Sequence, residues 1–313
     1  MERMHPMGRG RFSSTDWDIF SSATTTGRST REIFTAATLQ DNLNPARARN
    51  LTREARDSAS NPHSTPLIVG LDVTGSMHRI PDYMVRDGLP VLFKTIYDRK
   101  PVPDPQIMFA GIGDVVYDRA PLQVSQFEAD ISIAQQLKGL YLEGGGGANA
   151  SESYPLVWYF AGMHTSTDSF EKRRKKGYLF TIGDEMAPDS ITADQIQKVM
   201  GIRPQQDFLT SELLDLASQA WNVFHITIEE GSNYRRMPNR VRANWTDLLG
   251  QRALFLSDYR KLSELIVSTI QILEGESAEM VAGSWAGETA QVIRESTRGL
   301  SSNDGRRKWS PHF

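Results

Sequence analysis

Four short apolar runs constrain the fold of this chain more than any other feature. They are residues 66–72 (PLIVGLD), 106–113 (QIMFAGIG), 177–183 (GYLFTIG) and 223–228 (VFHITI). Continuous apolar runs of this length are typical of strands buried on both faces. Stretches with helical spacing separate them, which favours parallel strands connected by helices. The sequence therefore predicts an α/β fold: a doubly wound, mostly parallel sheet flanked by helices on both faces, with polar N- and C-terminal extensions.

Composition divides the chain into three zones. Residues 66–273 carry nearly all the strand signals and are predicted to form one domain, which a short strand at 253–256 and a helix at 259–273 complete. Residues 1–65 are polar, and we interpret them as an N-terminal extension that is partly helical. Residues 274–313 lose the pattern and are predicted to be a C-terminal tail, partly disordered on its own.

Composition also excludes several functions. The chain has no Cys, which rules out disulfides, thiolate nucleophiles and Cys-ligated zinc. Its formal net charge of -3 argues against a domain-wide electrostatic footprint for DNA. No run approaches the roughly 18 apolar residues of a membrane helix, and residues 1–20 have no apolar segment typical of a secretory signal. We therefore expect a cytoplasmic protein without membrane contact.

The turn after the first apolar run carries the most informative motif. Ligand sites of doubly wound sheets lie outside the carboxyl ends of the strands. There the chain reads Asp72-Val73-Thr74-Gly75-Ser76, which gathers one carboxylate and two hydroxyl groups. Such hard oxygen donors suit Mg²⁺ or Mn²⁺. The Lys of a phosphate-binding loop is missing, so the turn is not a P-loop.

Two further turns carry side chains suited to the same ion. Asp184 follows the run at 177–183, where a second carboxylate would reach the same edge of the sheet. The Gly-rich loop at 144–147 leads into Asn149, Ser151 and Glu152.

With these three loops, residues 66–273 resemble the von Willebrand factor type A (vWA) domain and its metal-ion-dependent adhesion site (MIDAS). The resemblance implies that the first loop and the acidic turn hold the metal, directly or through water. The second loop lacks the common Thr and is more similar to that of integrin β subunits, in which a Glu reaches the metal. Asn149 or Ser151 remain the alternatives to that Glu. The predicted ligands are Asp72, Thr74, Ser76, Glu152 and Asp184, with Mg²⁺ (or Mn²⁺) as the ion.

The resemblance also implies a function. We expect a non-enzymatic interaction module of the intracellular bacterial or phage type, whose cation captures a carboxylate of a protein partner. Related intracellular proteins act beside AAA+ ATPases or in multiprotein assemblies, so self-assembly is also open. The alternative is binding of RNA or single-stranded nucleic acid, as in Ro-type proteins, through the basic runs at 172–176 (KRRKK) and 306–308 (RRK). A metal-dependent hydrolase is a more distant possibility.

Each candidate residue also has a purely structural interpretation. The first loop could be a helix N-cap, Asp184 could cap the segment after it, and Glu152 could be a first-turn helix acid. Asp114, after the second run, is better explained as a turn residue than as a neighbour of the ion. His225, inside the fourth run, is better explained as a core residue than as a ligand.

Overall fold

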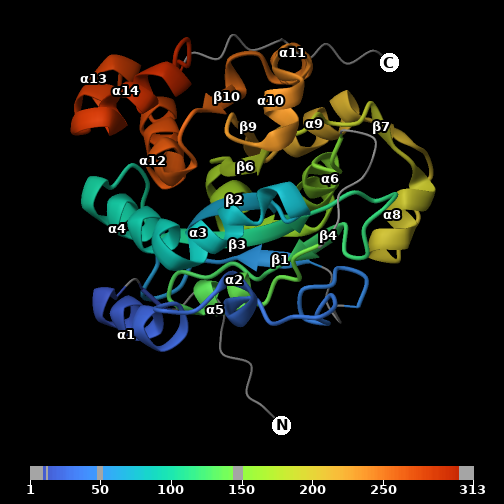
Figure 1. Cartoon of the computed structure of the whole chain (residues 1–313), viewed down its shortest axis with the longest axis horizontal. Coiled ribbons are helices and arrows are strands. Elements are labelled where there is room, and N and C mark those ends of the chain that lie inside the picture. The colour runs from blue at the N-terminus through green and yellow to red at the C-terminus, as the bar shows by residue number, and fades with distance from the viewer. Residues whose placement is uncertain (1–9, 12, 48–51, 144–150, 303–313) are drawn as a thin grey trace.

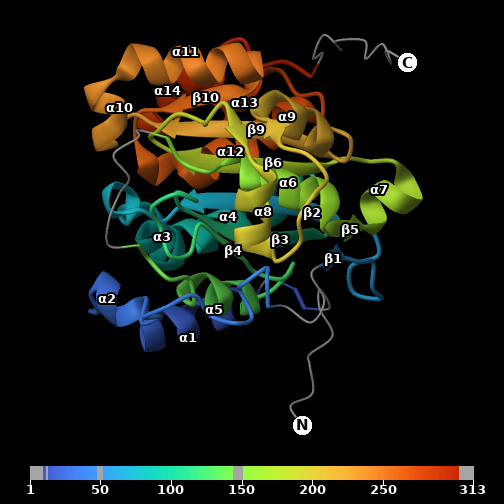
Figure 2. The same cartoon turned by 90° about the vertical axis from the view of Figure 1, so that its right-hand side faces the viewer.

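The described part of the chain builds one central six-stranded sheet. The computed structural model describes residues 10–11, 13–47, 52–143 and 151–302. The strand order is β10-β9-β6-β2-β3-β4, in which only β4 runs antiparallel to its neighbour. The strands are β2 (Thr65–Asp72), β3 (Pro105–Ile112), β4 (Leu122–Val124), β6 (Gly177–Gly183), β9 (Trp221–Ile228) and β10 (Ala253–Leu256). Helices cover both faces (Figures 1 and 2), so the predicted fold class is confirmed.

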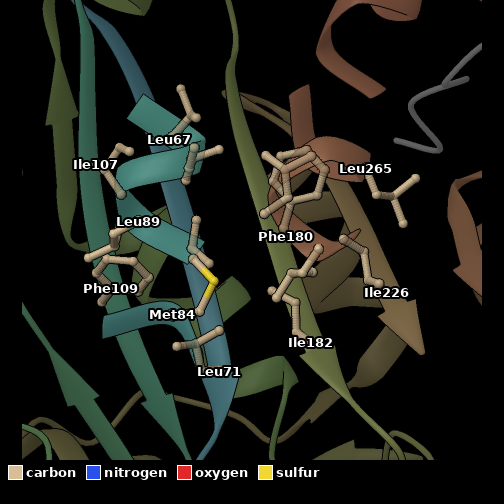
Figure 3. Packing of buried hydrophobic residues seen from close by; sticks show 14 of the residues in the cluster. Leu67, Leu71, Met84, Leu89, Ile107, Phe109, Phe180, Ile182, Ile226 and Leu265 are labelled. Carbon is tan, nitrogen blue, oxygen red and sulfur yellow. The ribbon is translucent and has the colours of Figure 1, made fainter. Parts of the chain in front are cut away.

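Both faces of the sheet are buried because apolar side chains alternate between two cores. On one face, Leu67 and Phe180 pack under α4 (Leu89–Arg99) and α12 (Leu262–Leu273), as Figure 3 shows in part. On the other face, the helices are α6 (Pro155–Met163), α9 (Thr210–Ser218) and α11 (Pro238–Leu249). Every residue of β2, β3 and β6 is buried, as expected for central strands covered by helices on both sides.

The chain reverses its direction of travel across the sheet between β2 and β6. From β2 it proceeds through β3 to β4 at one edge, and from β6 through β9 to β10 at the other edge. The carboxyl ends of β2 and β6 therefore flank the topological switch point, where doubly wound sheets bind their ligands.

Two prolines, Pro81 and Pro90, lie in the helical segment that follows β2. The first of its helices, α3 (Arg79–Tyr83), begins before Pro81. A π-helical turn at Met84–Gly88 then leads into α4. Proline has no N–H to donate, so it is tolerated in a first helical turn, and the π-turn accommodates the second proline.

The end segments add helices that pack on the α/β core. Near the N-terminus, α1 (Ser14–Thr24) and α2 (Thr30–Ile33) bury Trp17 and Ile33. Near the C-terminus, where the sequence predicted a tail, α13 (Ala278–Gly283) and α14 (Gly287–Ser296) bury Val281 and Ile293. The described parts of both ends therefore contribute to the hydrophobic core.

The remaining elements are short. They are β1 (Arg53–Ala55), α5 (Ser132–Lys138), β5 (Thr165–Thr167), α7 (Asp168–Arg173), β7 (Ser190–Ile191), α8 (Ala193–Met200), β8 (Phe208–Leu209) and α10 (Ser232–Arg236). Within the described residues, no helix has the length and apolar character needed to cross a membrane.

Candidate metal centre

Asp72 is the last residue of β2, and the turn after it folds back onto its carboxylate. The Thr74 amide and hydroxyl both donate to Asp72 Oδ1, at 2.9 and 2.6 Å. The Tyr154 hydroxyl donates to Oδ2 at 3.3 Å. Asp72 and Thr74 are fully buried. The third predicted residue of this loop, Ser76, has its backbone in the 3₁₀ turn Gly75–Met77, while its side chain lies outside the described part of the structure.

Asp184 follows β6 directly, on the other side of the switch point. One of its oxygens, Oδ2, accepts the backbone N–H of Asn233 at 2.9 Å, and the side-chain amide of Asn233 donates to Glu185. Oδ1 is buried and has no hydrogen-bond partner among the described residues. A Cβ at Gly231 would lie 2.2 Å from Asp184 Cβ, so only glycine allows the two segments to approach this closely.

Glu152 lies between the ends of β3 and β6. Its backbone N–H donates to Met186 O at 3.1 Å, and the neighbouring Ser153 hydroxyl accepts the N–H of Val115 at 2.9 Å. Although Glu152 is only 1% exposed, neither of its carboxylate oxygens has a partner within the described segments. Of the two alternatives, Ser151 forms a backbone bridge to Met186, and Asn149 lies outside the described residues.

The electrostatics couple these carboxylates to one another. Burial and the Asp184 carboxylate raise the pKa of Asp72 to about 7. Burial and the charge of Asp72 raise the pKa of Glu152 to about 11. Burial, Asp72 and Asp184 raise the pKa of Glu185 to about 8, against a lowering effect of Arg236. Acids from three segments therefore repel one another at one edge of the sheet.

The residues present fit a hard divalent cation. Buried carboxylate oxygens without partners are costly, and Asp184 Oδ1 and both oxygens of Glu152 are in that state among the described residues. Mg²⁺ and Mn²⁺ take oxygen ligands of this kind. Within the described chain, no three Asp, Glu or His side chains form an ion site by themselves. Any such site would therefore need hydroxyl oxygen, as the Thr74 side chain offers, or water.

The hydrogen bonds of the predicted ligands show which of them also cap a helix. The Thr74 side chain does not cap the 3₁₀ turn, and Glu152 precedes α6, whose N-cap is Tyr154. Asp184 does satisfy an amide in the first turn of α10, with one oxygen only.

Two other candidates have structural roles in the fold. Asp114 Oδ1 accepts the Val116 amide at 2.7 Å within its own turn. His225 is fully buried, hydrogen-bonds Thr181 through Nδ1 at 3.0 Å and stacks on Trp245.

Three residues of this region were not singled out from the sequence. Glu185 had a signal, because it follows Asp184 directly. Asn233 comes from α10 after a further strand, and Tyr154 resembled an ordinary packing residue at helical spacing. Their contributions depend on the tertiary fold, so spacing alone could not reveal them.

The basic run at 172–176 lies at the opposite, amino-terminal end of β6. Lys172 bonds Asp168 at 2.6 Å, Arg173 bonds Asp57 at 2.7 Å and Lys175 bonds Glu274 at 2.7 Å. The second basic run, 306–308, lies outside the described residues.

Comparison with known proteins gives similarity at the level of structure alone. No family model matches the chain, and no curated protein matches it. Solved structures that match include the pilus adhesin SpaC from Lactobacillus rhamnosus GG, at 10% identity over 69% of this chain and 31% of that one, with a TM-score of 0.47. Its open conformation matches with a TM-score of 0.42, at 10% identity over 70% of this chain and 31% of the adhesin. A von Willebrand factor type A protein from Catenulispora acidiphila matches at 13% identity over 69% of this chain and 44% of that one, with a TM-score of 0.39. The chain thus spans less than half the length of each.

Proposed function

We propose that this chain is a vWA-type interaction module with a MIDAS-like site, which binds a protein partner through a divalent cation. One observation carries the proposal: buried carboxylates from three segments converge at the switch point of the sheet, with oxygens that no described residue satisfies. The proposed ligands of Mg²⁺ (or Mn²⁺) are Asp72, Thr74, Ser76, Glu152 and Asp184.

The role of the protein side chains in this proposal is to hold the ion while leaving a coordination position open. Thr74 fixes one oxygen of Asp72, and Asn233 fixes one oxygen of Asp184, so both carboxylates are oriented before any ion arrives. Mg²⁺ keeps several water ligands when proteins bind it. An acidic side chain of a partner can replace one of these waters, which makes partner binding depend on the cation.

We propose binding rather than catalysis. A catalytic hydroxyl would have to reach a substrate. The Thr74 hydroxyl of the first loop is buried and donates to Asp72, so it is poorly placed to attack one. The cytoplasmic location remains a proposal from the sequence, and a place in a multiprotein assembly or beside an AAA+ ATPase remains a proposal that rests on the family resemblance.

The contacts of the basic run argue against the nucleic-acid alternative. A phosphate-binding patch needs cations that are free to meet phosphate. Three of the five cations in the run, Lys172, Arg173 and Lys175, instead bond carboxylates of the same chain. A fourth, Lys176, donates to the backbone oxygen of Ser218.

Calorimetric titration with Mg²⁺ and Mn²⁺ tests the proposal. We expect the wild type to bind the ion and Asp72→Ala to lose binding, with circular dichroism confirming that the variant remains folded. Asp98→Ala is the matched control, because Asp98 is an exposed acid on α4 that bonds only Lys94 among the described residues. Absence of binding by the wild type, or full binding by folded Asp72→Ala, would contradict the proposal.

A further inference from the structure

The side chain of Tyr154 contacts three neighbouring strands. It immediately precedes α6 and is completely buried. Its hydroxyl donates to Asp72 at the end of β2. At the end of β6, a Cβ on Gly183 would lie only 1.9 Å from the same hydroxyl oxygen. On β9, the His225 ring meets the Tyr154 ring edge-on, with centroids 4.9 Å apart.

An aromatic cluster fixes the Tyr154 ring in this position. Trp245 of α11 packs edge-on against Tyr154 at 5.4 Å and stacks on His225 at 3.5 Å. The Trp245 indole N–H donates to the backbone oxygen of Glu185 at 2.9 Å, which connects the cluster to the loop after β6. Because the ring is held from several sides, its hydroxyl has little freedom to leave Asp72.

The hydroxyl completes the hydrogen bonding of the Asp72 carboxylate. Oδ1 accepts the Thr74 amide and hydroxyl, and Oδ2 accepts Tyr154. With both oxygens engaged, the plane of the carboxylate is fixed. Groups that orient a metal ligand in this way typically contribute about 10- to 100-fold to metal affinity.

The sequence around Tyr154 supports a role in this site. Tyr154 lies two residues after Glu152, so one short segment supplies both a proposed ligand and the group that orients another. The glycine at 183 is also required, because any side chain there would displace the hydroxyl.

From these contacts we infer that Tyr154 is the positioning residue of the proposed metal centre, and that it acts through Asp72 without touching the ion. The inference rests on the proposed function.

Tyr154→Phe tests the inference, because it keeps the ring in its aromatic cluster and removes only the hydroxyl. We expect calorimetry to give a 10- to 100-fold weaker Mg²⁺ affinity with an unchanged near-ultraviolet dichroism spectrum. Tyr159→Phe is the matched control: Tyr159 lies in α6, is 4% exposed and packs against Phe208 and His164. Unlike Tyr154, which precedes α6, Tyr159 lies inside that helix and has no contact with Asp72 among the described residues, so this control should bind Mg²⁺ like the wild type.

A second measurement does not depend on the metal. In metal-free protein, Tyr154→Phe should melt at a lower temperature than the wild type. The same substitution made in Asp72→Ala should lower the melting temperature much less. A purely structural role for the hydroxyl would lower the melting temperature equally in both backgrounds.

The outcomes separate the two ideas. Wild-type affinity in Tyr154→Phe, or equal melting effects in both backgrounds, would overturn the inference and leave the proposed function standing. Absence of Mg²⁺ binding by the wild type would overturn both.

Discussion

Acidic side chains at the two ends of the central strands are in opposite electrostatic environments. At the amino ends of β2 and β6, Asp57 bonds Arg173 at 2.7 Å and Asp168 bonds Lys172 at 2.6 Å. Burial alone would raise the pKa of Asp57, but hydrogen bonds from Arg173 and Ser64 lower it to about 2. At the carboxyl ends, burial and neighbouring carboxylates raise the pKa values of Asp72 and Glu185 to about 7 and 8.

The difference shows which acids serve the fold. An acid with a paired cation stabilises the native state, whereas a buried acid among other acids destabilises it until a cation arrives. Sites that break the rules of stable packing are often functional. The contrast therefore supports a structural role for the amino-end acids and a binding role for those at the carboxyl end.

The largest effect should come from Asp184→Asn. We expect loss of Mg²⁺ affinity by more than about 100-fold, because a neutral amide replaces a proposed carboxylate ligand. The amide oxygen can still accept the Asn233 N–H, so the metal-free melting temperature should stay the same or rise as a buried like charge is removed. Calorimetry and thermal melts in EDTA measure both. A clear drop in metal-free stability would mean that the carboxyl-end acids are structural, like those at the amino end.

Asp57→Asn should show the reverse behaviour. A pKa lowered from 3.8 to about 2 corresponds to about 2 kcal/mol of stability at pH 7. Urea unfolding should detect that loss, while Mg²⁺ affinity stays at the wild-type value. Asp98→Asn, at an exposed ion pair, is the control and should cost less than about 1 kcal/mol. Weakened Mg²⁺ binding in Asp57→Asn would show that the two ends are coupled.

The two ends should also respond to pH with opposite sign. Asp57 has a lowered folded pKa, so its contribution is present above about pH 4 and is lost as pH falls toward 2. Glu185 has a raised folded pKa, so metal-free stability should fall as pH rises from about 4.5 to about 8. Urea unfolding of metal-free protein at pH 3, 5 and 8 should therefore give a maximum near pH 5. Stability that rises from pH 5 to 8 would contradict the raised pKa values.

The strands were the most predictable part of the fold. The runs at 177–183 and 253–256 match β6 and β10 residue for residue, since apolar strands leave a local signal whether they are buried on both faces, as β6 is, or lie at the edge of the sheet, as β10 does. Helical spacing is less exact as a guide: it extends over residues 127–142, but α5 covers only Ser132–Lys138. In the C-terminal α13 and α14, only a few side chains of each helix reach the core, so the apolar residues are too sparse to predict these helices from the sequence.

The candidate site was predictable only where its residues follow strands. Asp72 and Asp184 could be placed at one edge because both come directly after apolar runs. The position of Tyr154 could not be predicted, since its hydroxyl reaches Asp72 only in the folded chain and only because residue 183 of β6 is a glycine. Identification of the metal ligands from the sequence remains a prediction.

The smallest effect should come from neutralising the basic run at the amino end. In the variant Lys172→Gln/Lys175→Gln, partly exposed ion pairs to Asp168 and Glu274 are lost, which should change the melting temperature little and leave Mg²⁺ affinity unchanged. A fluorescent 20-nucleotide single-stranded RNA, titrated at 50 and 200 mM NaCl, should bind the variant and the wild type alike, because both lysines already bond carboxylates. Tight, steeply salt-dependent RNA binding that the variant loses would restore the nucleic-acid alternative. It would also show that the amino end of the strands binds a partner.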